Sequence, residues 1–578
     1  MPAATEEAAP TPLATTRAPG ARPQVQATPT PVPTAAPAAT AAPAPAATAK
    51  ITRVIMANTV PLNESNRIWV GPWSNLVQND PYGETLIENH EITSEPIPAL
   101  AKSWTVSAGF DTWTFELEEG IPWHYGFGEF TAADVAHTHY LVTREDSNSN
   151  FKATWDTATT EIHDDYSISF NFDKPQLTGG RLFSRLQGDL VIQSKAQWDA
   201  AGGDDSAYDE MAAGTGSYQF AGRDLGSSVW YEKIDYDHWA GENPDFQELE
   251  WVWSAEQFTR LSLLLAGEVQ GSDLSREVQV DAKAAGMKVV SSNNENNQSY
   301  GFFGGTYLST MDSDLNPYPD GKNPYYTGEE PWHNPVVREA FNIAVDRQAI
   351  IDEVYFGNAS SVYVPVYAPF TEGWSDRWVS EFDEKYGYDP DRAVALLAEA
   401  GYGPGDISID MMSTVIPGNP EIPQLIQVLS TMWEAIGVDT NIIELELGTW
   451  LDTVRAHDIH ETFTILRNTP IRTTQEGLRV FWVSEPDGFL FGWEDDIINQ
   501  KYDCLERSLD IDEREQCARD AGDYMFDDFL TLPLFQTTFD MTIDPEFISE
   551  WVYPGVGSAH PTHVHNIKAC PVGTDRCD

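Results

Sequence analysis

The chain has 578 residues, of which 41% are hydrophobic and 12% aromatic, and its formal net charge is −56. This length exceeds what one hydrophobic core usually supports, so we expect two or three lobes. Such an acidic surface repels nucleic acid and anionic lipid, which argues against both as partners. No run of eighteen apolar residues occurs, so no membrane-spanning helix is predicted.

Residues 1–50 consist almost entirely of Ala, Pro and Thr. Such a segment cannot bury apolar surface, so we predict an extended, disordered tether. It contains neither the apolar core of a signal peptide nor a cysteine that could be acylated. It nevertheless resembles the stalk behind a bacterial lipoprotein or signal anchor. Our hypothesis is therefore an extracytoplasmic, tethered protein whose export signal was trimmed or lies upstream of Met1.

Residues 99–142 indicate two strands followed by a helix. Trp104 and Val106 share one face of the first strand, and residues 109–111 supply the turn. The second strand alternates polar residues with the apolar set Trp113, Phe115 and Leu117. Thr131 is expected to cap the helix, with Asp134 as the acidic partner of a capping box. The apolar side of that helix is formed by Val135, Thr138 and Val142.

Three later segments predict further helices, which alternate with strands. Asp389-Pro390 and Asn334-Pro335 each place a capping side chain before a proline at the first helical position. The first of these helices stops at Gly401, and another, from about Glu421 to Ile436, stops at Gly437. The sequence VDTNIIELEL that follows Gly437 predicts a strand with alternating Ile443, Leu445 and Leu447. This alternation of strands and helices favours α/β lobes.

These segments, in this order, resemble the solute-binding proteins of bacterial ATP-binding-cassette (ABC) importers, specifically the dipeptide/oligopeptide/nickel family (family 5). No single segment is decisive, but together the segments follow the family order across residues 95–540. The matching blocks are PALAKSW, TWTFELEEGIPWH, FTAADV, GTGSY, IDYDHWAGENPDFQELEW, TRLSLLLAGEVQ, NPVVREAFNIAVDRQAI, YDPDRAVALLAEAGY, MWEAIGVDTNIIELEL and DDFLTLPLFQ.

The resemblance implies a periplasmic-binding-protein-like α/β fold, with two lobes joined by a two-segment hinge and an additional inserted lobe. The hairpin and helix within residues 99–142 would then begin the inserted lobe. The expected organisation is a tether at 1–50, lobe I at 51–95, 214–290 and 535–578 with the C-terminal tail, inserted lobe II at 96–213, and lobe III at 291–534.

The function implied is that of a receptor which captures a peptide or peptide-sized solute between lobes and delivers it to a membrane permease. Its partners would be that solute and the permease subunits of an ABC transporter, and we expect a monomer with no cofactor. Two alternatives stay open: an oligosaccharide receptor of the same fold, because tryptophan is abundant, and a secreted hydrolase. No GxSxG, HExxH or phosphate-binding glycine loop supports catalysis, so no catalytic residue is predicted.

Position relative to the family blocks predicts where ligand contacts lie. Peptide binders of the family usually carry an aspartate after the strand matching residues 462–466, and it pairs with the peptide amino terminus. Here Arg467 and Asn468 follow instead, with Arg472 nearby, which favours a carboxylate or phosphate on the ligand. The alternative is that Arg467 pairs with a local acid. The predicted ligand contacts are Asn58, Trp69, Trp73, Gln270, Phe303, Trp450, Arg467 and Asn468.

The four cysteines form two close pairs in the sequence, which fits disulfides in an oxidising compartment, with four free thiols as the alternative. They are Cys504, Cys517, Cys570 and Cys577. We predict no metal site. The loop from Asp312 to Gly321 begins like a calcium loop but lacks its glycine and final glutamate. The cluster His560, His563 and His565, whose last two members would share a strand face, is more typical of ordinary surface.

A pair of histidines and a set of tryptophans are two further candidates for a functional role. His137 and His139 lie two apart on the predicted helix, so they point in different directions and make a poor pair of metal ligands. Eight tryptophans are too many for cores alone, so some of them are expected to line the cleft, although for any single one a buried packing role is the stronger expectation. They are Trp69, Trp73, Trp230, Trp251, Trp253, Trp450, Trp482 and Trp493.

Overall fold

The computed structural model describes residues 49–577 with several short gaps. The gaps are residues 62, 71–75, 91–94, 150, 178–179, 186–189, 293–294, 296, 470–472, 486–487, 489–491 and 553–560. Of the predicted tether, the structure therefore describes Ala49 and Lys50. Ala49 forms a β-bridge with Pro571, and Lys50 Nζ donates to the carbonyl oxygens of Glu546 and Asp575 at 2.7 and 2.9 Å. These two residues belong to the folded body.

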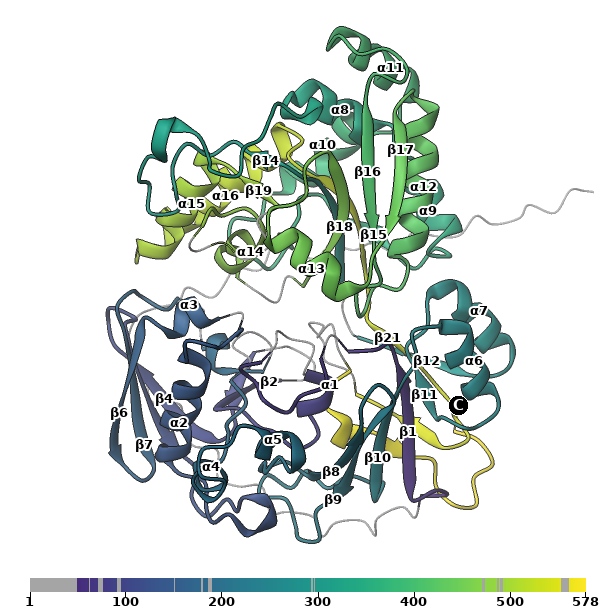
Figure 1. Ribbon diagram of the computed structural model, residues 1–578. Helices are drawn as coiled ribbons and strands as arrows, with labels where there is room; N and C mark the ends of the chain where they lie inside the picture. The colour runs from purple at the N-terminus through teal and green to yellow at the C-terminus, as the bar shows by residue number, and fades with distance from the viewer. Residues whose placement is uncertain are drawn as a thin grey trace, which may run out of the picture. The chain divides into compact units, whose positions relative to one another are not determined.

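Lobe I is built around a seven-stranded sheet of order β12-β21-β11-β1-β10-β9-β8. Its strands are β1 (Arg53–Asn58), β8 (Tyr218–Asp224), β9 (Ser228–Lys233), β10 (Glu248–Trp253), β11 (Gly271–Ser272), β12 (Lys288–Ser291) and β21 (Asp540–Ile543). β1 runs parallel to β10 and β11, so the carboxyl ends of these three strands lie at one edge. Helices α6 (Gln257–Leu265) and α7 (Arg276–Ala284) lie beside β11 and β12 (Figure 1).

The inserted lobe contains a four-stranded antiparallel sheet of order β4-β5-β7-β6. Its elements are β4 (Ala101–Val106), β5 (Thr112–Leu117), β6 (Ala158–Asp164), β7 (Ser167–Phe172), α2 (Ala132–Thr143), α3 (Lys152–Trp155), α4 (Lys195–Ala200) and α5 (Ser206–Glu210). The predicted alternation is confirmed, since all three apolar residues of β5 are buried. In the turn before β5 it is Phe110, rather than the neighbouring glycine, that adopts the positive φ of 56°.

Lobe III is built around a six-stranded sheet of order β15-β20-β13-β18-β16-β17. Its strands are β13 (Asn297–Phe303), β15 (Ser360–Ser361), β16 (Ser408–Ser413), β17 (Asp439–Glu444), β18 (Thr462–Asn468) and β20 (Leu532–Thr537). β13 is antiparallel to β18 and β20, so the carboxyl ends of β16, β18 and β20 share one edge with the start of β13. β20 runs through the border predicted between residues 534 and 535.

Nine helices accompany this sheet among the residues described. They are α8 (Pro335–Ile343), α9 (Arg347–Glu353), α10 (Asp376–Tyr386), α11 (Pro390–Glu399), α12 (Ile422–Ala435), α13 (Leu447–Arg455), α14 (Thr474–Phe481), α15 (Asp496–Arg507) and α16 (Ile511–Asp527). Figure 1 shows α12 alongside β16 and β17, and α15 next to α16.

Smaller elements complete the chain. They are α1 (Leu76–Asn79), β2 (Ile87–Asn89), β3 (Pro96–Pro98), β14 (Thr306–Tyr307), β19 (Trp493–Glu494), β22 (Ile548–Glu550), β23 (Lys568–Ala569) and the 3₁₀ turns η1 (His124–Gly126), η2 (Arg181–Phe183), η3 (Pro319–Gly321), η4 (Pro331–His333) and η5 (Val564–Asn566).

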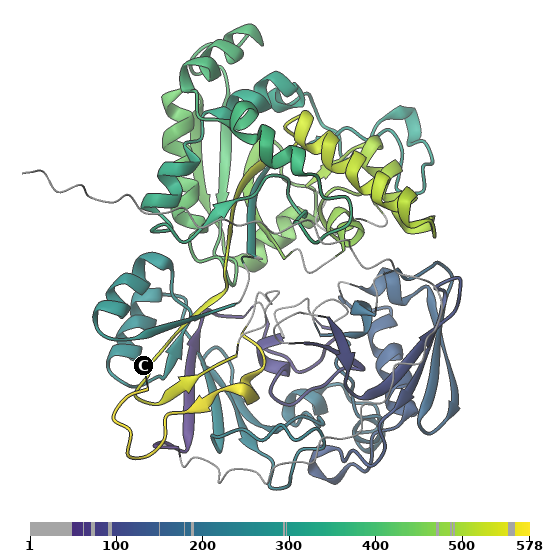
Figure 2. The same ribbon diagram turned by 180° about the vertical axis from the view of Figure 1, so that it is seen from behind.

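Two chain segments connect lobe I with lobe III. One leads from β12 into β13, and the other leads from β20 into β21. Figure 2 shows the second as the yellow segment that runs from the sheet of lobe III into lobe I. The segments are tied together where Ser292 donates its backbone N–H to the carbonyl oxygen of Phe539 at 2.9 Å, and Phe539 donates its N–H to the Ser292 hydroxyl at 3.1 Å.

Most predicted helix ends are confirmed. The Asp134 carboxylate accepts from the Thr131 N–H at 2.8 Å, and Asn334 and Asp389 accept from backbone N–H groups in the first turns of α8 and α11. The strand predicted through Leu447 is wrong at its end. β17 stops at Glu444 because it is an edge strand with little burial, and Leu447 already begins α13.

Both predicted disulfides are present. Cys504 of α15 is bonded to Cys517 of α16, which links two neighbouring helices of lobe III. Cys570 is bonded to Cys577 and closes a small loop at the end of the chain. The alternative of four free thiols is therefore excluded.

Candidate functional site

A pocket lies where the carboxyl edges of the two large sheets approach the crossing segments. From lobe I it is lined by Asn58, which ends β1, and by Asp273, Leu274 and Arg276 after β11. Lobe III contributes residues 417, 418 and 420, and residues 538–541 of the crossing segment complete the lining together with Pro561. The pocket holds about 450 Å³, part of it open to solvent. In open α/β sheets this edge is the usual place for ligands, because loops leave the strands there.

A buried ion pair connects the two lobes at this pocket. Arg276 begins α7 in lobe I, and its Nη1 lies 3.0 Å from Oε1 of Glu421, the residue that precedes α12 in lobe III. The backbone N–H of Arg276 donates to the same oxygen at 3.0 Å, so the carboxylate also caps α7. Asp540 Oδ2 lies 3.3 Å from Nη2. Burial acts to lower the pKa of Arg276, but Glu421 and Asp540 outweigh it, and the pKa is raised.

Asp273 adds a second buried charge on the lobe I side. Its Oδ1 lies 3.0 Å from Nε of Arg260. Burial raises the pKa of the Asp273 carboxyl, and the neighbouring Arg260 opposes that rise. Two guanidinium–carboxylate pairs therefore lie at this edge, Arg276–Glu421 between the lobes and Arg260–Asp273 within lobe I.

Polar side chains also line the carboxyl edge of the lobe III sheet. Asn297, which begins β13, donates to the Gly418 carbonyl at 2.7 Å and to the Thr537 hydroxyl at 3.2 Å. Asn468, which ends β18, differs from it. Its side chain is only 2% exposed, and neither its Oδ1 nor its Nδ2 has a hydrogen-bond partner among the residues described. A buried amide in this state costs free energy unless a ligand satisfies it.

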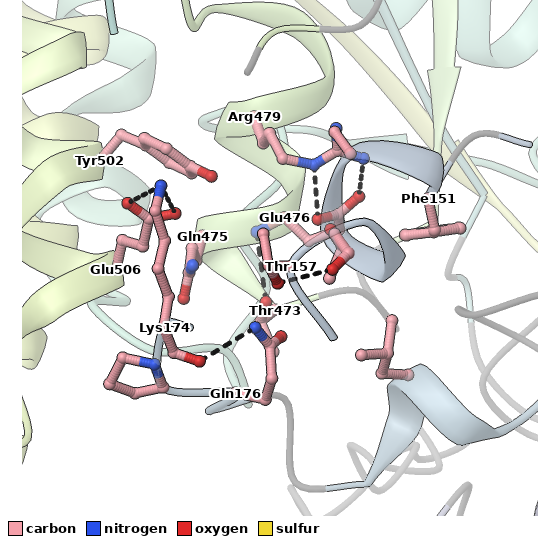
Figure 3. Close-up of a pocket in the computed structure, with 14 residues that line it drawn as sticks. Phe151, Thr157, Lys174, Gln176, Thr473, Gln475, Glu476, Arg479, Tyr502 and Glu506 are labelled. Atoms are coloured by element: carbon pink, nitrogen blue, oxygen red, sulfur yellow. Dashed lines mark hydrogen bonds and ion pairs between the residues drawn. The ribbon is translucent and has the colours of Figure 1, made fainter. Parts of the chain in front are cut away.

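A second pocket lies between the inserted lobe and lobe III (Figure 3). Lys174 Nζ lies 3.1 Å from both carboxylate oxygens of Glu506, and the Arg479 guanidinium lies 5.6 Å from the ring centroid of Phe151. Arg479 is held by Glu476 of the same helix at 2.7 and 2.9 Å. The pocket spans about 640 Å³, part of it open to solvent. These contacts join the two lobes at a distance from the crossing segments.

Comparison with known proteins identifies the family of this chain. Residues 95–466 match the model of the bacterial extracellular solute-binding proteins, family 5. The chain belongs to this family. It is a binding protein rather than an enzyme, and it serves an ABC import system. The structure has no helix, within the ranges described, that is both long and apolar enough to cross a bilayer.

The relatives of this family 5 protein bind different solutes. The dipeptide-binding protein of Escherichia coli K12 is 26% identical over 405 residues, which cover 66% of this chain and 69% of that protein. The heme-binding protein A of Haemophilus influenzae is 25% identical, with 64% of each chain covered.

Solved structures confirm the predicted fold class. A periplasmic binding protein of Helicobacter pylori in complex with a peptide has a TM-score of 0.70 at 19% identity, covering 89% of this chain and 98% of that one. A Campylobacter jejuni protein in complex with nickel and histidine has a TM-score of 0.71 at 16% identity, covering 89% and 99%.

The predicted contact residues of this family 5 protein fall into two groups. Asn58 lines the pocket and Asn468 lies at the lobe III edge, with the half-buried Arg467 one position before it in β18. The other described members have structural partners in buried positions. Trp69, Phe303 and Trp450 pack in cores, and Gln270 accepts from the Ile55 N–H at 2.9 Å. Trp73 and Arg472 lie outside the described residues.

Most of the eight tryptophans have a packing role, as expected for any single one of them. Of the eight tryptophans considered, six are at most 8% exposed and pack in the cores. Trp230 is half-buried, and Trp73 lies outside the described residues. The surplus that motivated the oligosaccharide alternative is therefore largely core.

The other residue groups behave as packing or loop residues. His137 and His139 contact different partners, the Tyr208 hydroxyl at 3.3 Å and the Trp155 carbonyl at 3.0 Å. In the calcium-like loop, Asp312 accepts from the Asn316 N–H at 2.8 Å, so its carboxylate serves the turn.

Sequence reasoning missed the Arg276–Glu421 pair. The two residues are 145 positions apart, and nothing local marks either of them as a partner of the other. The available signal was composition, since 34 basic residues face 90 acidic ones. An arginine beside apolar residues such as Leu274 and Val278 is then a candidate for a buried pair.

Proposed function

We propose that the protein captures a peptide or peptide-sized solute at the carboxyl edges of its two large sheets and delivers it to an ABC permease. The observation that carries this proposal is the buried amide of Asn468. One acceptor and one donor that lack partners among the described residues match the N–H and C=O of a peptide bond. The names of the dipeptide-binding relatives support the same class of ligand.

The ligand would lie between the lobe I edge, with Asn58, and the lobe III edge, with Arg467 and Asn468. Arg467 favours a ligand that brings a carboxylate to this end of β18. Binding to both edges favours the conformation in which the lobes are together, because only that conformation offers both sets of contacts. The permease would recognise this conformation.

The test is calorimetric titration of the full chain with peptides of two to five residues, after a thermal-shift screen of peptide and oligosaccharide pools. Asn468→Leu removes the amide at similar volume. We expect it to weaken peptide binding about 5- to 150-fold, the equivalent of 1–3 kcal/mol for a buried polar group left unpaired.

Asn441→Leu is the matched control. Asn441 is exposed on the edge strand β17 of the same sheet, where it donates to Asp410 at 2.8 Å, so peptide affinity should not change. Peptide should be recovered intact by mass spectrometry. Acetylating the peptide amino group should leave binding in place, whereas amidating its carboxylate should weaken it. Equal affinities of Asn468→Leu and the unmodified protein, or stabilisation by oligosaccharides alone, would show the proposal to be wrong.

A further inference from the structure

A cluster of histidine and glutamate side chains lies in lobe I outside the interlobe pocket. Glu84 follows α1, His238 and Glu242 belong to the loop after β9, and His565 lies in η5 near the C-terminus. Oε2 of Glu242 lies 3.9 Å from Nδ1 of His238 and 3.6 Å from Nδ1 of His565. Oε1 of Glu84 lies 3.4 Å from Nε2 of His238.

Three of these donors lie close together. One ligand atom from each of Glu84, His238 and Glu242 lies within 4.8 Å of the other two. His565 approaches this group at Glu242, 3.6 Å from its Oε2. Ligands about 2.1 Å from one metal lie roughly 3–4 Å from each other, so the side chains must turn toward the ion to complete the site.

The hydrogen bonding of His238 leaves one ring nitrogen directed into the cluster. Its Nε2 lies 3.1 Å from the carbonyl oxygen of Thr215, which can only accept, so Nε2 carries the proton. Nδ1 then presents a lone pair. This atom is buried and has no hydrogen-bond partner within the described part of the chain, and the His238 side chain is 1% exposed. The atom that faces it is Oε2 of Glu242, at 3.9 Å. A metal ion between these two atoms would satisfy both of them.

The Arg185 guanidinium does not occupy the cluster. It pairs with Asp80 at 2.8 Å and with Glu88 at 3.2 Å, so its charge is engaged elsewhere. Oε2 of Glu242 instead faces Nδ1 of His238 and Nδ1 of His565, which places one carboxylate oxygen between two imidazole nitrogens.

We propose that Glu84, His238, Glu242 and His565 bind one divalent transition-metal ion, with Zn²⁺ the best fit. Two imidazole nitrogens and two carboxylates suit Zn²⁺ and its neighbours, whereas Ca²⁺ and Mg²⁺ prefer sites made of oxygen alone. Outer partners are in place, because the Thr215 carbonyl orients His238 and the indole N–H of Trp239 donates to Oε2 of Glu84 at 2.8 Å.

The proposal differs from what the sequence alone suggested. The expected strand through the histidines is the 3₁₀ turn η5, and His563, at its N-terminal end, has a positive φ of 58°. His563 Nδ1 pairs with the Thr562 hydroxyl at 3.0 Å, and His560 lies outside the described residues. Of the two histidines that the structure describes here, His565 alone joins the site. The ion would pin the C-terminal segment to lobe I. Because the site is separate from the interlobe pocket, its failure would leave the solute-binding proposal untouched.

The test is calorimetric titration of the chelator-treated full chain with Zn²⁺ in the presence of millimolar Ca²⁺, which occupies the many surface carboxylates. We expect one equivalent of Zn²⁺ to bind and to raise Tm. His565→Gln and Glu242→Gln should each weaken binding about tenfold or more, since even the loss of an outer partner has an effect of that size. His563→Gln, two residues from His565, is the matched control and should bind as tightly as the unmodified protein.

Co²⁺ provides a readout that needs no variant. Ligation through two Nδ1 atoms leaves two Nε2–H groups, which should appear in the NMR spectrum as two exchangeable, paramagnetically shifted resonances. The absence of these resonances would overturn the proposal even if the variants failed to fold. So would competition by Ca²⁺ at equal affinity, or Zn²⁺ affinities that are the same in His565→Gln, Glu242→Gln and the unmodified protein.

Discussion

The ion pair between Arg276 and Glu421 makes the sharpest prediction about how the lobes move. Both side chains are at most 4% exposed, one belongs to each lobe, and their charged atoms are 3.0 Å apart. Arg276→Met removes the guanidinium and leaves the Glu421 carboxylate with the backbone N–H of residue 276 but no counter-ion. Breaking a buried pair on one side costs about 3–5 kcal/mol, because an uncompensated charge remains in the protein interior.

The protein can relieve this cost without unfolding. Since Glu421 lies between lobes, separation of the lobes returns its carboxylate to water, whereas a buried charge inside one lobe is relieved only by unfolding. We therefore expect Arg276→Met to shift the population toward separated lobes and to weaken solute binding. The double variant Arg276→Met/Glu421→Gln removes the charge and should restore most of both properties.

The assay is small-angle X-ray scattering combined with urea unfolding. The radius of gyration should rise in Arg276→Met and return toward the original value in the double variant. Arg514→Met is the control, because Arg514 pairs with Glu372 at 2.9 Å entirely within lobe III. It should lower the free energy of unfolding and leave the radius of gyration unchanged. If Arg276→Met and Arg514→Met change the scattering equally, or if the double variant is no better than the single one, the reasoning fails.

Three other predictions concern the stability of single lobes. Replacing both Cys504 and Cys517 by serine should lower the free energy of unfolding by about 3 kcal/mol in a urea titration, because the unfolded chain regains the entropy of a loop of this size; an unchanged midpoint would contradict it. Burial lowers the pKa of His124 to about 4, so this residue contributes stability above its unfolded pKa of 6.5 that is lost as the pH falls toward 4. The loss of stability should be smaller in His124→Gln. A pH profile of stability with the same slope in both proteins would contradict this prediction. A change from glycine to alanine stabilises most helices by about 1 kcal/mol. Gly522→Ala should instead destabilise α16, because the new Cβ would lie 2.5 Å from the Trp378 ring. A raised Tm would show that the ring can move.

Local features of the structure could be predicted from the sequence because their causes are local. Asn334 and Asp389 cap helices whose first residue is proline, and the two cysteine pairs are near neighbours in the chain. The end of β17 could not be predicted, since an edge strand has few contacts to favour either conformation over 445–447. The same holds for Phe110, whose positive φ depends on a turn that the preceding glycine was expected to supply.

The candidate site was predictable only by position within the family. Asn58 and Asn468 fall at strand ends, where the family order of blocks placed them. Trp69 and Trp450 pack in cores, and their contact with a ligand stays a prediction. An aromatic residue in a sequence carries no mark that separates a core role from a cleft role. The Arg276–Glu421 pair and the histidine–glutamate cluster depend on segments brought together by the fold, so no spacing in the sequence could reveal them.

The bridge between Ala49 and Pro571 has a practical consequence for experiments on this molecule. Ala49, the first described residue, pairs through its backbone with Pro571, which lies in the loop closed by the Cys570–Cys577 disulfide. Both segments therefore lie on lobe I. Fluorophores attached at residue 49 and in the loop closed by Cys570 and Cys577 would thus keep their separation whatever the lobes do, and a sensor of solute capture needs one dye in lobe III. The same proximity makes a circular permutant of residues 49–577 feasible, with residues 49 and 577 joined by a short linker and new ends opened at an exposed turn.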